Sequence, residues 1–155
     1  MDLHVTAVAL EGLLLQARER FALAFEDRGV TFTVTAPPGA LQVHADAERA
    51  QQILSNLLSN ALRHTPPGGA VHLRAERRGA VAVVTVADSG SGVKAEHLER
   101  IFERSFRADA ARTRGDGSGV GLTIARGLAR AMRGDVTVSS VLGEGSTFTW
   151  TVPVA

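Results

Sequence analysis

Two asparagines and two basic side chains share one side of a predicted helix, where they could bind a cation. The segment LSNLLSNALRH (54–64) has apolar residues at helical spacing. Four of its polar side chains fall within an arc of roughly 100°: Asn56, Asn60, Arg63 and His64. Asparagine is a poor helix former, and these two have no acidic partner nearby, so their carbonyl oxygens remain available to a cation. A solvated helix face is the competing interpretation.

A carboxylate followed by two glycines marks the end of a predicted strand. In VADSGSGV (86–93), the strand delivers Asp88 at its carboxyl end, where ligands collect in α/β sheets, and Gly90 and Gly92 follow. The carboxylate can accept a hydrogen bond from an amino group, and the glycines allow a flat ring to lie against the backbone. An ordinary Asp-Ser-Gly turn is the competing interpretation.

The stretch GDGSGVGL (115–122) leads through four glycines into another predicted helix. Unpaired N–H groups and the positive end of the helix dipole favour a phosphate at such a helix start. The spacing is not GxGxxG, no strand leads directly into it, and the lysine of a P-loop is missing. Upstream arginines could pair with a triphosphate: Arg104, Arg107, Arg112 and Arg114. A flexible glycine loop beside a solvated basic stretch is the competing interpretation.

Interleaved helices and strands must position these residues. We expect helices at about 6–28, 46–64 (with Asp46 as the N-cap), 95–103 and 120–132, and strands at 30–36, 41–44, 70–77, 80–87, 136–140 and 146–154. Tight turns join several strand pairs, which argues against a wholly parallel, doubly wound sheet. The pattern predicts an α+β fold, a two-layer α/β sandwich with helices on one face of a mixed, mostly antiparallel sheet. The long irregular segment 104–118 has the length of a lid or binding loop.

Composition limits the possible partners. The chain has 155 residues with 45% apolar and 21% charged side chains, which is typical of one soluble globular domain. A net charge of +1 gives no general electrostatic reason to bind nucleic acid or an anionic membrane, and the absence of cysteine excludes thiol chemistry. No apolar run is long enough to cross a bilayer, and the start resembles no signal peptide. We therefore expect a cytoplasmic domain without nucleic-acid or direct membrane contact.

Taken in order, five motifs resemble the sequence boxes of sensor histidine kinase ATP-binding domains. They are NLLxNA (56–61), DxGxG (88–92), IFERxFR (101–107), GxGxGL (117–122) and GxGSxF (143–148). The superfamily also includes gyrase, mismatch-repair and heat-shock chaperone ATPases, and its fold is a mixed sheet backed by helices. The resemblance implies that residues 29–155 are an ATP-binding catalytic domain. The helix at 1–28 would pack on it as a stub leading out of a dimerisation domain, within one globular unit.

The resemblance implies ATP and Mg²⁺ as cofactors and gives individual residues a role. Asn60 would coordinate the Mg²⁺, with Asn56 beside it. Asp88 would accept a hydrogen bond from the adenine amino group and so select ATP over GTP. The other residues implied at the nucleotide are Arg63, His64, Gly90, Gly92, Phe106, Arg107, Gly117, Gly119, Val120, Gly121, Leu122 and Ser146.

Phosphoryl transfer is the implied chemistry, with Asn60, Arg63 and Arg107 as the catalytic residues. Phe106 and Arg107 would belong to a lid. Ser146 replaces the usual threonine near the adenine and keeps its hydroxyl. ATP-hydrolysing members of the superfamily commonly have a glutamate where this chain has Ser59, so we do not expect fast hydrolysis.

The implied acceptor of the phosphoryl group is a histidine on a separate dimerisation domain, with a response regulator downstream. None of the chain's histidines has the local sequence of an acceptor: His4, His44, His64, His72 and His97. We therefore expect a monomeric catalytic fragment that cannot phosphorylate itself. Two alternatives stay open. One is an anti-sigma-factor-type serine kinase of the same superfamily, against which the IFERSFR segment argues, and the other is an ATP-sensing interaction module without transfer activity.

Overall fold

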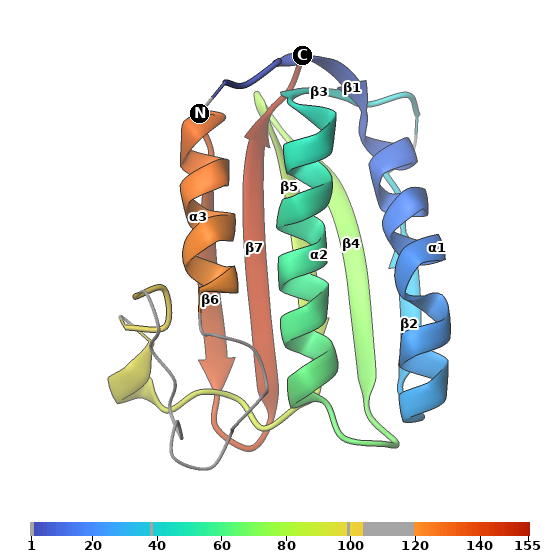
Figure 1. The fold of residues 1–155 in the computed structure, drawn as a ribbon, viewed down its shortest axis with the longest axis vertical. Coiled ribbons are helices and arrows are strands. Elements are labelled where there is room, and N and C mark those ends of the chain that lie inside the picture. The colour runs from blue at the N-terminus through green and yellow to red at the C-terminus, as the bar shows by residue number, and fades with distance from the viewer. Residues whose placement is uncertain (1, 38, 99, 104–119) are drawn as a thin grey trace.

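The structure, a computed structural model, describes residues 2–37, 39–98, 100–103 and 120–155. Three long helices lie in front of the main sheet (Figure 1). In chain order, the elements are β1 (Thr6–Ala9), α1 (Leu10–Arg28), β2 (Thr31–Thr35), β3 (Gln42–Ala45), α2 (Ala47–His64), β4 (Ala70–Arg78), β5 (Val81–Asp88), a short 3₁₀ turn (Ala95–His97), α3 (Gly121–Ala131), β6 (Asp135–Val141) and β7 (Gly145–Pro153).

The main sheet has five strands in the order β2-β4-β5-β7-β6, and β1 pairs with β3 in a separate two-stranded sheet. β2 and β4 run parallel, whereas β4–β5, β5–β7 and β7–β6 are antiparallel. All three helices cover the same face of this sheet (Figure 1). The predicted α+β sandwich with a mixed, mostly antiparallel sheet is confirmed.

The core lies between the helices and the sheet. Along β7 every second residue is buried, so Phe148, Trp150 and Val152 face inward, and Trp150 lies opposite Val84 of β5. α2 contributes four large, fully buried side chains from its inner side: Ile53, Leu54, Leu57 and Leu58. Each such side chain stabilises the fold by about 1.5–3 kcal/mol relative to its exposed state. This packing fixes the rotation of α2 and therefore the direction of its polar residues.

Two of the expected helices are shorter in the structure. The helix expected from residue 6 begins only at Leu10, because residues 6–9 form β1, with Thr6 opposite Ala45 of β3. The His4 N–H group donates to Asp46 Oδ2 at 2.9 Å, which holds the start of the chain beside β3. The helix expected at 95–103 is reduced to the 3₁₀ turn, where His97 N–H donates to the Lys94 carbonyl, because a short polar segment cannot sustain an α-helix.

Helices α2 and α3 lie where the sequence pattern predicts them. Asp46 is the N-cap of α2, since its Oδ1 accepts a hydrogen bond from Arg49 N–H at 3.1 Å. The backbone hydrogen bonds from His4 and Arg49 lower the pKa of the Asp46 carboxyl. Within the part of the chain that the structure describes, no helix is both long and apolar enough to cross a membrane.

Candidate nucleotide-binding site

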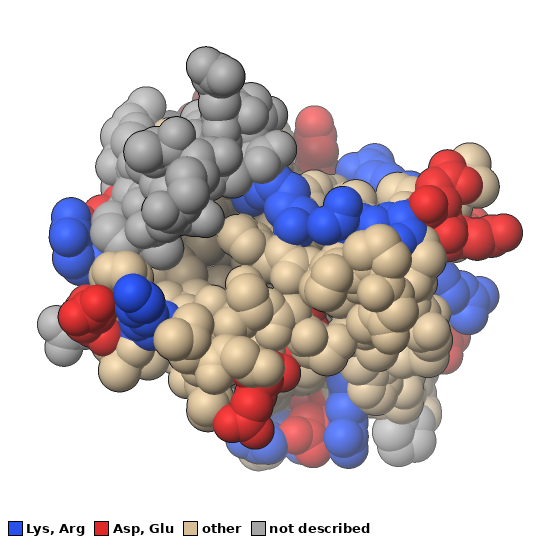
Figure 2. All heavy atoms as spheres, turned by 90° about the horizontal axis from the view of Figure 1, so that it is seen from below, with Lys and Arg blue, Asp and Glu red and all other residues tan. Residues whose placement is uncertain are grey.

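The described candidate residues gather at one end of the sandwich. This end contains the last turn of α2, the carboxyl end of β5 and the start of β7, at the bottom of Figure 1, and the start of α3 lies higher and faces the same side. Seen from this end, lysine and arginine side chains form a band above an uncharged surface (Figure 2). Arg28, the last residue of α1, and Arg63, in the last turn of α2, are both exposed.

The two asparagines of α2 differ in environment. Asn60 is only 7% exposed, which is unusual for a polar side chain on a surface helix. Asn56 is half-buried, and its Nδ2 donates to the Gly121 carbonyl at 2.9 Å. This hydrogen bond joins α2 to the start of α3 through the amide nitrogen, and the Asn56 side-chain oxygen takes no part in it. Amide oxygens are ligands that suit Mg²⁺, so the donor set fits the expected metal.

Asp88 is a buried carboxylate at the end of β5, with 9% of its surface exposed. Burial raises the pKa of the Asp88 carboxyl, while hydrogen bonds from the backbone of Gly90 and Ser146 and the charge of His64 oppose this rise. The Gly90 N–H donates to Asp88 Oδ1 at 2.8 Å. A carboxylate oriented in this way can accept a hydrogen bond from an amino group of a ligand.

Gly90 and Gly92 have a packing role within the protein itself. A Cβ atom at Gly90 would lie 2.2 Å from the His64 carbonyl oxygen, and one at Gly92 would lie 2.3 Å from the Val141 carbonyl oxygen. The two glycines therefore let the end of α2 and the β6–β7 turn approach the segment after β5. A side chain at Gly90 would separate the segment after Asp88 from the end of α2, and one at Gly92 would separate it from the β6–β7 turn.

Ser146 brings a hydroxyl to the same end of the sandwich. Its partner there is Ser140, a residue that the motifs did not indicate. Ser146 is 8% exposed and lies opposite Asp88 in the β5–β7 register. Its Oγ lies 2.9 Å from Oγ of Ser140, which also donates to the Gly145 carbonyl and accepts from Val93 N–H at 2.7 Å. Ser140 thus ties the loop after β5 to the final hairpin. A hydroxyl on the inward-facing side of β6, in line with Val136 and Val138, was the available signal.

Four of the expected site residues lie outside the described residues: Phe106, Arg107, Gly117 and Gly119. Phe102, just before the first of them, packs on the body of the domain. Its ring makes an edge contact with Phe148 at 6.2 Å between centroids, and the Arg126 guanidinium lies 4.7 Å from its centre. Thr123 Oγ1 donates to the Phe102 carbonyl at 2.6 Å. Val120 and Leu122 are both half-buried. Val120 is the N-cap of α3, and Leu122 is its second residue.

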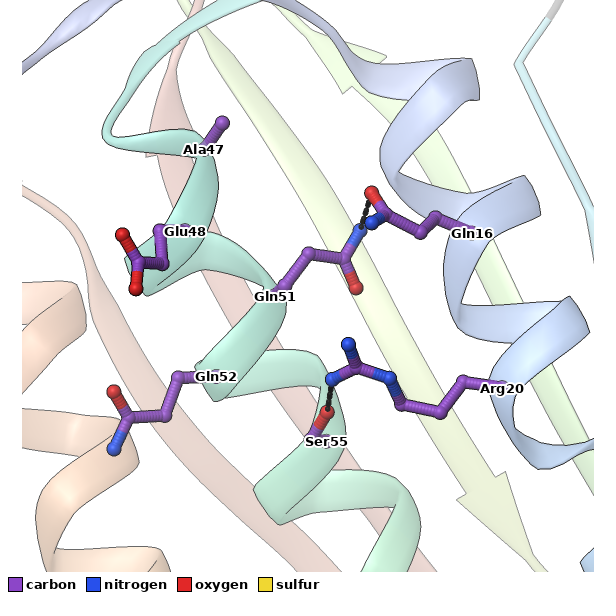
Figure 3. A pocket seen from close by; sticks show the side chains of 7 residues that line it. All are labelled: Gln16, Arg20, Ala47, Glu48, Gln51, Gln52 and Ser55. Carbon is purple, nitrogen blue, oxygen red and sulfur yellow. Dashed lines mark hydrogen bonds between the residues drawn. The ribbon is translucent and has the colours of Figure 1, made fainter.

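A cavity lies away from these residues, between α1 and the amino-terminal half of α2 (Figure 3). This cavity of about 490 Å³ is lined by Gln16, Arg20, Ala47, Glu48, Gln51, Gln52 and Ser55. Gln51 Nε2 donates to Gln16 Oε1 at 3.1 Å, and Arg20 Nη1 donates to Ser55 Oγ at 3.0 Å, so hydrogen bonds between the helices cross it. It contains none of the residues implied by the motifs, and the end of the sandwich remains the candidate site.

Comparison with known proteins identifies the family of this chain. The family described as "Histidine kinase-, DNA gyrase B-, and HSP90-like ATPase" matches residues 45–155. The chain belongs to this family. The adaptive-response sensory kinase SasA of Thermosynechococcus vestitus is 39% identical over 146 residues, which are 94% of this chain and 38% of that kinase. The family membership and the resemblance to sensor histidine kinases, both predicted from the five motifs, are confirmed.

Solved structures of this family have the same fold. Full-length ShkA in complex with AMPPNP is 33% identical with a TM-score of 0.88, and the match covers 100% of this chain and 32% of ShkA. The nucleotide-free catalytic domain of the histidine kinase ThkA is 26% identical with a TM-score of 0.86 and matches 97% of this chain and 98% of that domain. The chain therefore spans about a third of the full-length kinases and nearly all of an isolated catalytic domain.

Proposed function

We propose that this family member binds ATP together with Mg²⁺ at the end of the sandwich and transfers the γ-phosphoryl group to a histidine supplied by another domain. The observation that supports this most is the buried Asp88 carboxylate, held by Gly90 N–H beside the polar end of α2. The transfer step is supported by similarity to sensory kinases such as SasA, of which this chain spans only a part. Binding of ATP is supported by similarity to ShkA, which was solved in complex with AMPPNP.

Asp88 and Ser146 form the proposed adenine end of the site. Asp88 accepts a hydrogen bond from the amino group of adenine, which guanine cannot donate from the equivalent position, because it has a carbonyl there. Ser146 lies opposite Asp88 and places a hydroxyl beside the base. Gly90 and Gly92 bring the backbone close enough for this arrangement.

The carboxyl-terminal half of α2 forms the proposed phosphate end. Asn60 and Asn56 would hold the Mg²⁺ through their amide oxygens, and the bound ion would neutralise the charge of the phosphates. Arg63 contacts the phosphates, and His64 lies near the nucleotide. The proposed partners from the lid and the start of α3 are Phe106, Arg107, Gly117, Gly119, Val120, Gly121 and Leu122, with Asn60, Arg63 and Arg107 as catalytic residues.

Positioning and charge stabilisation account for the proposed chemistry. The acceptor imidazole nitrogen attacks the γ-phosphorus, the bond to the β–γ bridging oxygen breaks, and ADP leaves while the imidazole loses its proton to solvent. Arg63 and Arg107 offset the charge on the transferring group. Ser59 offers no carboxylate to activate a water molecule, which favours transfer over hydrolysis.

The proposed partners are a histidine-bearing dimerisation domain and, downstream, a response regulator. We propose that residues 1–28 lead from that dimerisation domain into this one, and that the chain by itself is a monomer on the cytoplasmic side of the cell.

Calorimetric titration with Mg²⁺-ATP and, separately, Mg²⁺-GTP tests nucleotide binding and its selectivity. Mixing the chain with a separate hairpin domain that carries an acceptor histidine then tests transfer, and the expected product is acid-labile phosphohistidine. Acid-stable phosphoserine on a protein partner would instead indicate a serine kinase. Binding of ATP without transfer to either acceptor would indicate an interaction module.

A further inference from the structure

We infer that Arg28, the last residue of α1, is a positioning residue for the nucleotide site because it fixes the carboxyl end of α2. This inference rests on the proposed function of that site. Arg28 lies outside the family match, which begins at residue 45, and outside the five motifs. It reaches the site through backbone carbonyls rather than through a ligand.

The guanidinium of Arg28 binds two carbonyls at the end of α2. Its Nε donates to the Thr65 carbonyl at 2.8 Å, and its Nη2 donates to the Arg63 carbonyl at 3.2 Å. The last carbonyls of a helix have no partner within the helix, and a cation placed there also interacts favourably with the helix dipole. A planar fork of donors can bind both oxygens at once, which the single ammonium of lysine does not reproduce.

The connection that follows Arg28 holds the loop after α2 from the same side. Gly29 ends α1 with φ at 77°, a conformation that favours glycine, and its carbonyl accepts from Gly68 N–H at 2.8 Å. Thr31 N–H donates to the Gly69 carbonyl at 3.0 Å. The turn at residues 65–69 is therefore attached to the end of α1 and to β2 at several points. Arg28 extends this attachment to the last turn of α2 through the Arg63 carbonyl.

The end of α2 is also in direct contact with the adenine side of the site. The His64 carbonyl, between the two carbonyls that Arg28 binds, lies against Gly90, where a Cβ atom would come within 2.2 Å of it. Gly90 N–H in turn orients Asp88 through the 2.8 Å hydrogen bond to Oδ1. A shift of the α2 end would thus displace Arg63 on the phosphate side and Asp88 on the adenine side together.

If Arg28 only capped α2, it would stabilise the fold without affecting the affinity for ATP, whereas a positioning residue would affect both. This difference between the two roles allows a test. At a temperature far below the unfolding midpoint almost every molecule is folded, so a loss of stability alone leaves the Kd for ATP unchanged. A positioning role changes the folded site itself. We therefore expect Arg28→Ala to weaken Mg²⁺-ATP binding about tenfold, in the range found when groups that orient a ligand-binding residue are removed.

Arg18→Ala is the matched control, because Arg18 is an exposed arginine of the same helix whose side chain makes no hydrogen bond or ion pair within the described residues. Calorimetry at 15 °C, on the full chain, measures the Kd of each variant, and circular dichroism measures its Tm. We expect the control to bind like the wild type, Arg28→Lys to lie between wild type and Arg28→Ala, and added methylguanidinium to restore part of the affinity of Arg28→Ala. The Gly90 amide resonance should move in Arg28→Ala and stay unchanged in the control.

Equal Kd values for wild type and Arg28→Ala, with only the Tm lowered, would overturn the positioning role. If Arg28→Ala does not fold, Arg28→Lys decides the question, and a Kd equal to that of the wild type overturns it. No heat from the wild type with Mg²⁺-ATP would refute the proposed function, and the inference with it. Binding by the wild type with an unaffected arginine variant refutes the inference alone.

Discussion

Asp88 on β5 and Ser146 on β7 lie directly opposite each other in an antiparallel register, and both side chains are buried. A carboxylate and a hydroxyl therefore lie side by side, in line with inward-facing positions that pair apolar residues, such as Val86 with Phe148. Burial raises the pKa of the Asp88 carboxyl despite the hydrogen bond from Gly90 N–H, so the ionised group is unfavourable here. Its placement therefore favours a role in binding a ligand.

Replacing the Asp88 carboxylate by an amide should nearly abolish ATP binding. Asp88→Asn keeps the shape of the side chain, but its amide can present a donor to the donor group of adenine. We expect the Kd to rise on the order of 100-fold, since a buried donor would lose its partner. Calorimetry on this variant and on Asp27→Asn, an exposed position of α1, makes the comparison. Near-normal affinity in Asp88→Asn would refute the adenine assignment.

Protonation of Asp88 should affect stability and binding in opposite directions. Because burial raises the pKa of Asp88 above its usual 3.8, the folded state takes up a proton more readily than the unfolded state. Its contribution to the free energy of unfolding is thus fully present below 3.8 and is lost as the pH rises through the raised pKa. ATP affinity should instead fall as the pH decreases through that pKa.

Denaturant unfolding of the wild type and Asp88→Asn across this pH range isolates the contribution of Asp88. The comparison is needed because Asp46, whose pKa is lowered, contributes stability that is lost as the pH falls and would mask the effect in the wild type alone. A stability difference between wild type and variant that does not change with pH would contradict the raised pKa.

Asn60→Ala should remove most of the Mg²⁺ dependence of ATP binding. The truncation deletes the buried amide oxygen that we propose as a metal ligand, while the α2 backbone stays intact because alanine is a good helix former. The measurement is the ratio of the Kd values for ATP in EDTA and in Mg²⁺, which should fall close to one. Ser59→Ala, the neighbouring position on α2, should keep the wild-type ratio. A wild-type ratio in Asn60→Ala would place the metal elsewhere.

Gly90→Ala should destabilise the domain and impair the site together. The added methyl group would lie 2.2 Å from the His64 carbonyl oxygen, so the end of α2 and the segment after β5 must separate, at a cost of about 1–3 kcal/mol. Gly127→Ala on α3 is the control, because a Cβ atom there meets nothing within 4 Å and alanine favours a helix. Equal unfolding free energies for Gly90→Ala and the wild type would contradict this close packing.

Local patterns were sufficient to predict most of the elements and to select candidate residues that the fold brings to one end of the sandwich. Asp46 could be predicted as an N-cap because capping depends on residues a few positions apart. β1 could not, because its pairing with β3 depends on contacts such as that of His4 with Asp46, 42 residues away. A helical hydrophobic pattern over 6–28 contains no information about such a contact.

The same limit explains the supporting residues that the motifs omit. Ser140 and Arg28 both form hydrogen bonds with backbone atoms that are distant in the sequence, whose positions depend on the complete fold. Gly90 and Gly92 were predicted to give space to a base, and the structure adds the close approach of two protein carbonyls, which no glycine spacing could indicate.

β2 is the outer strand that covers the side of β4, and it lies wholly before residue 45, where the family match begins. A shortened protein that started at this boundary would leave the amide and carbonyl groups along one side of β4 open to strands of other molecules. It would also lose the α1 side chains that pack against α2. The minimal unit that stays dispersed in solution should therefore include the segment upstream of the boundary.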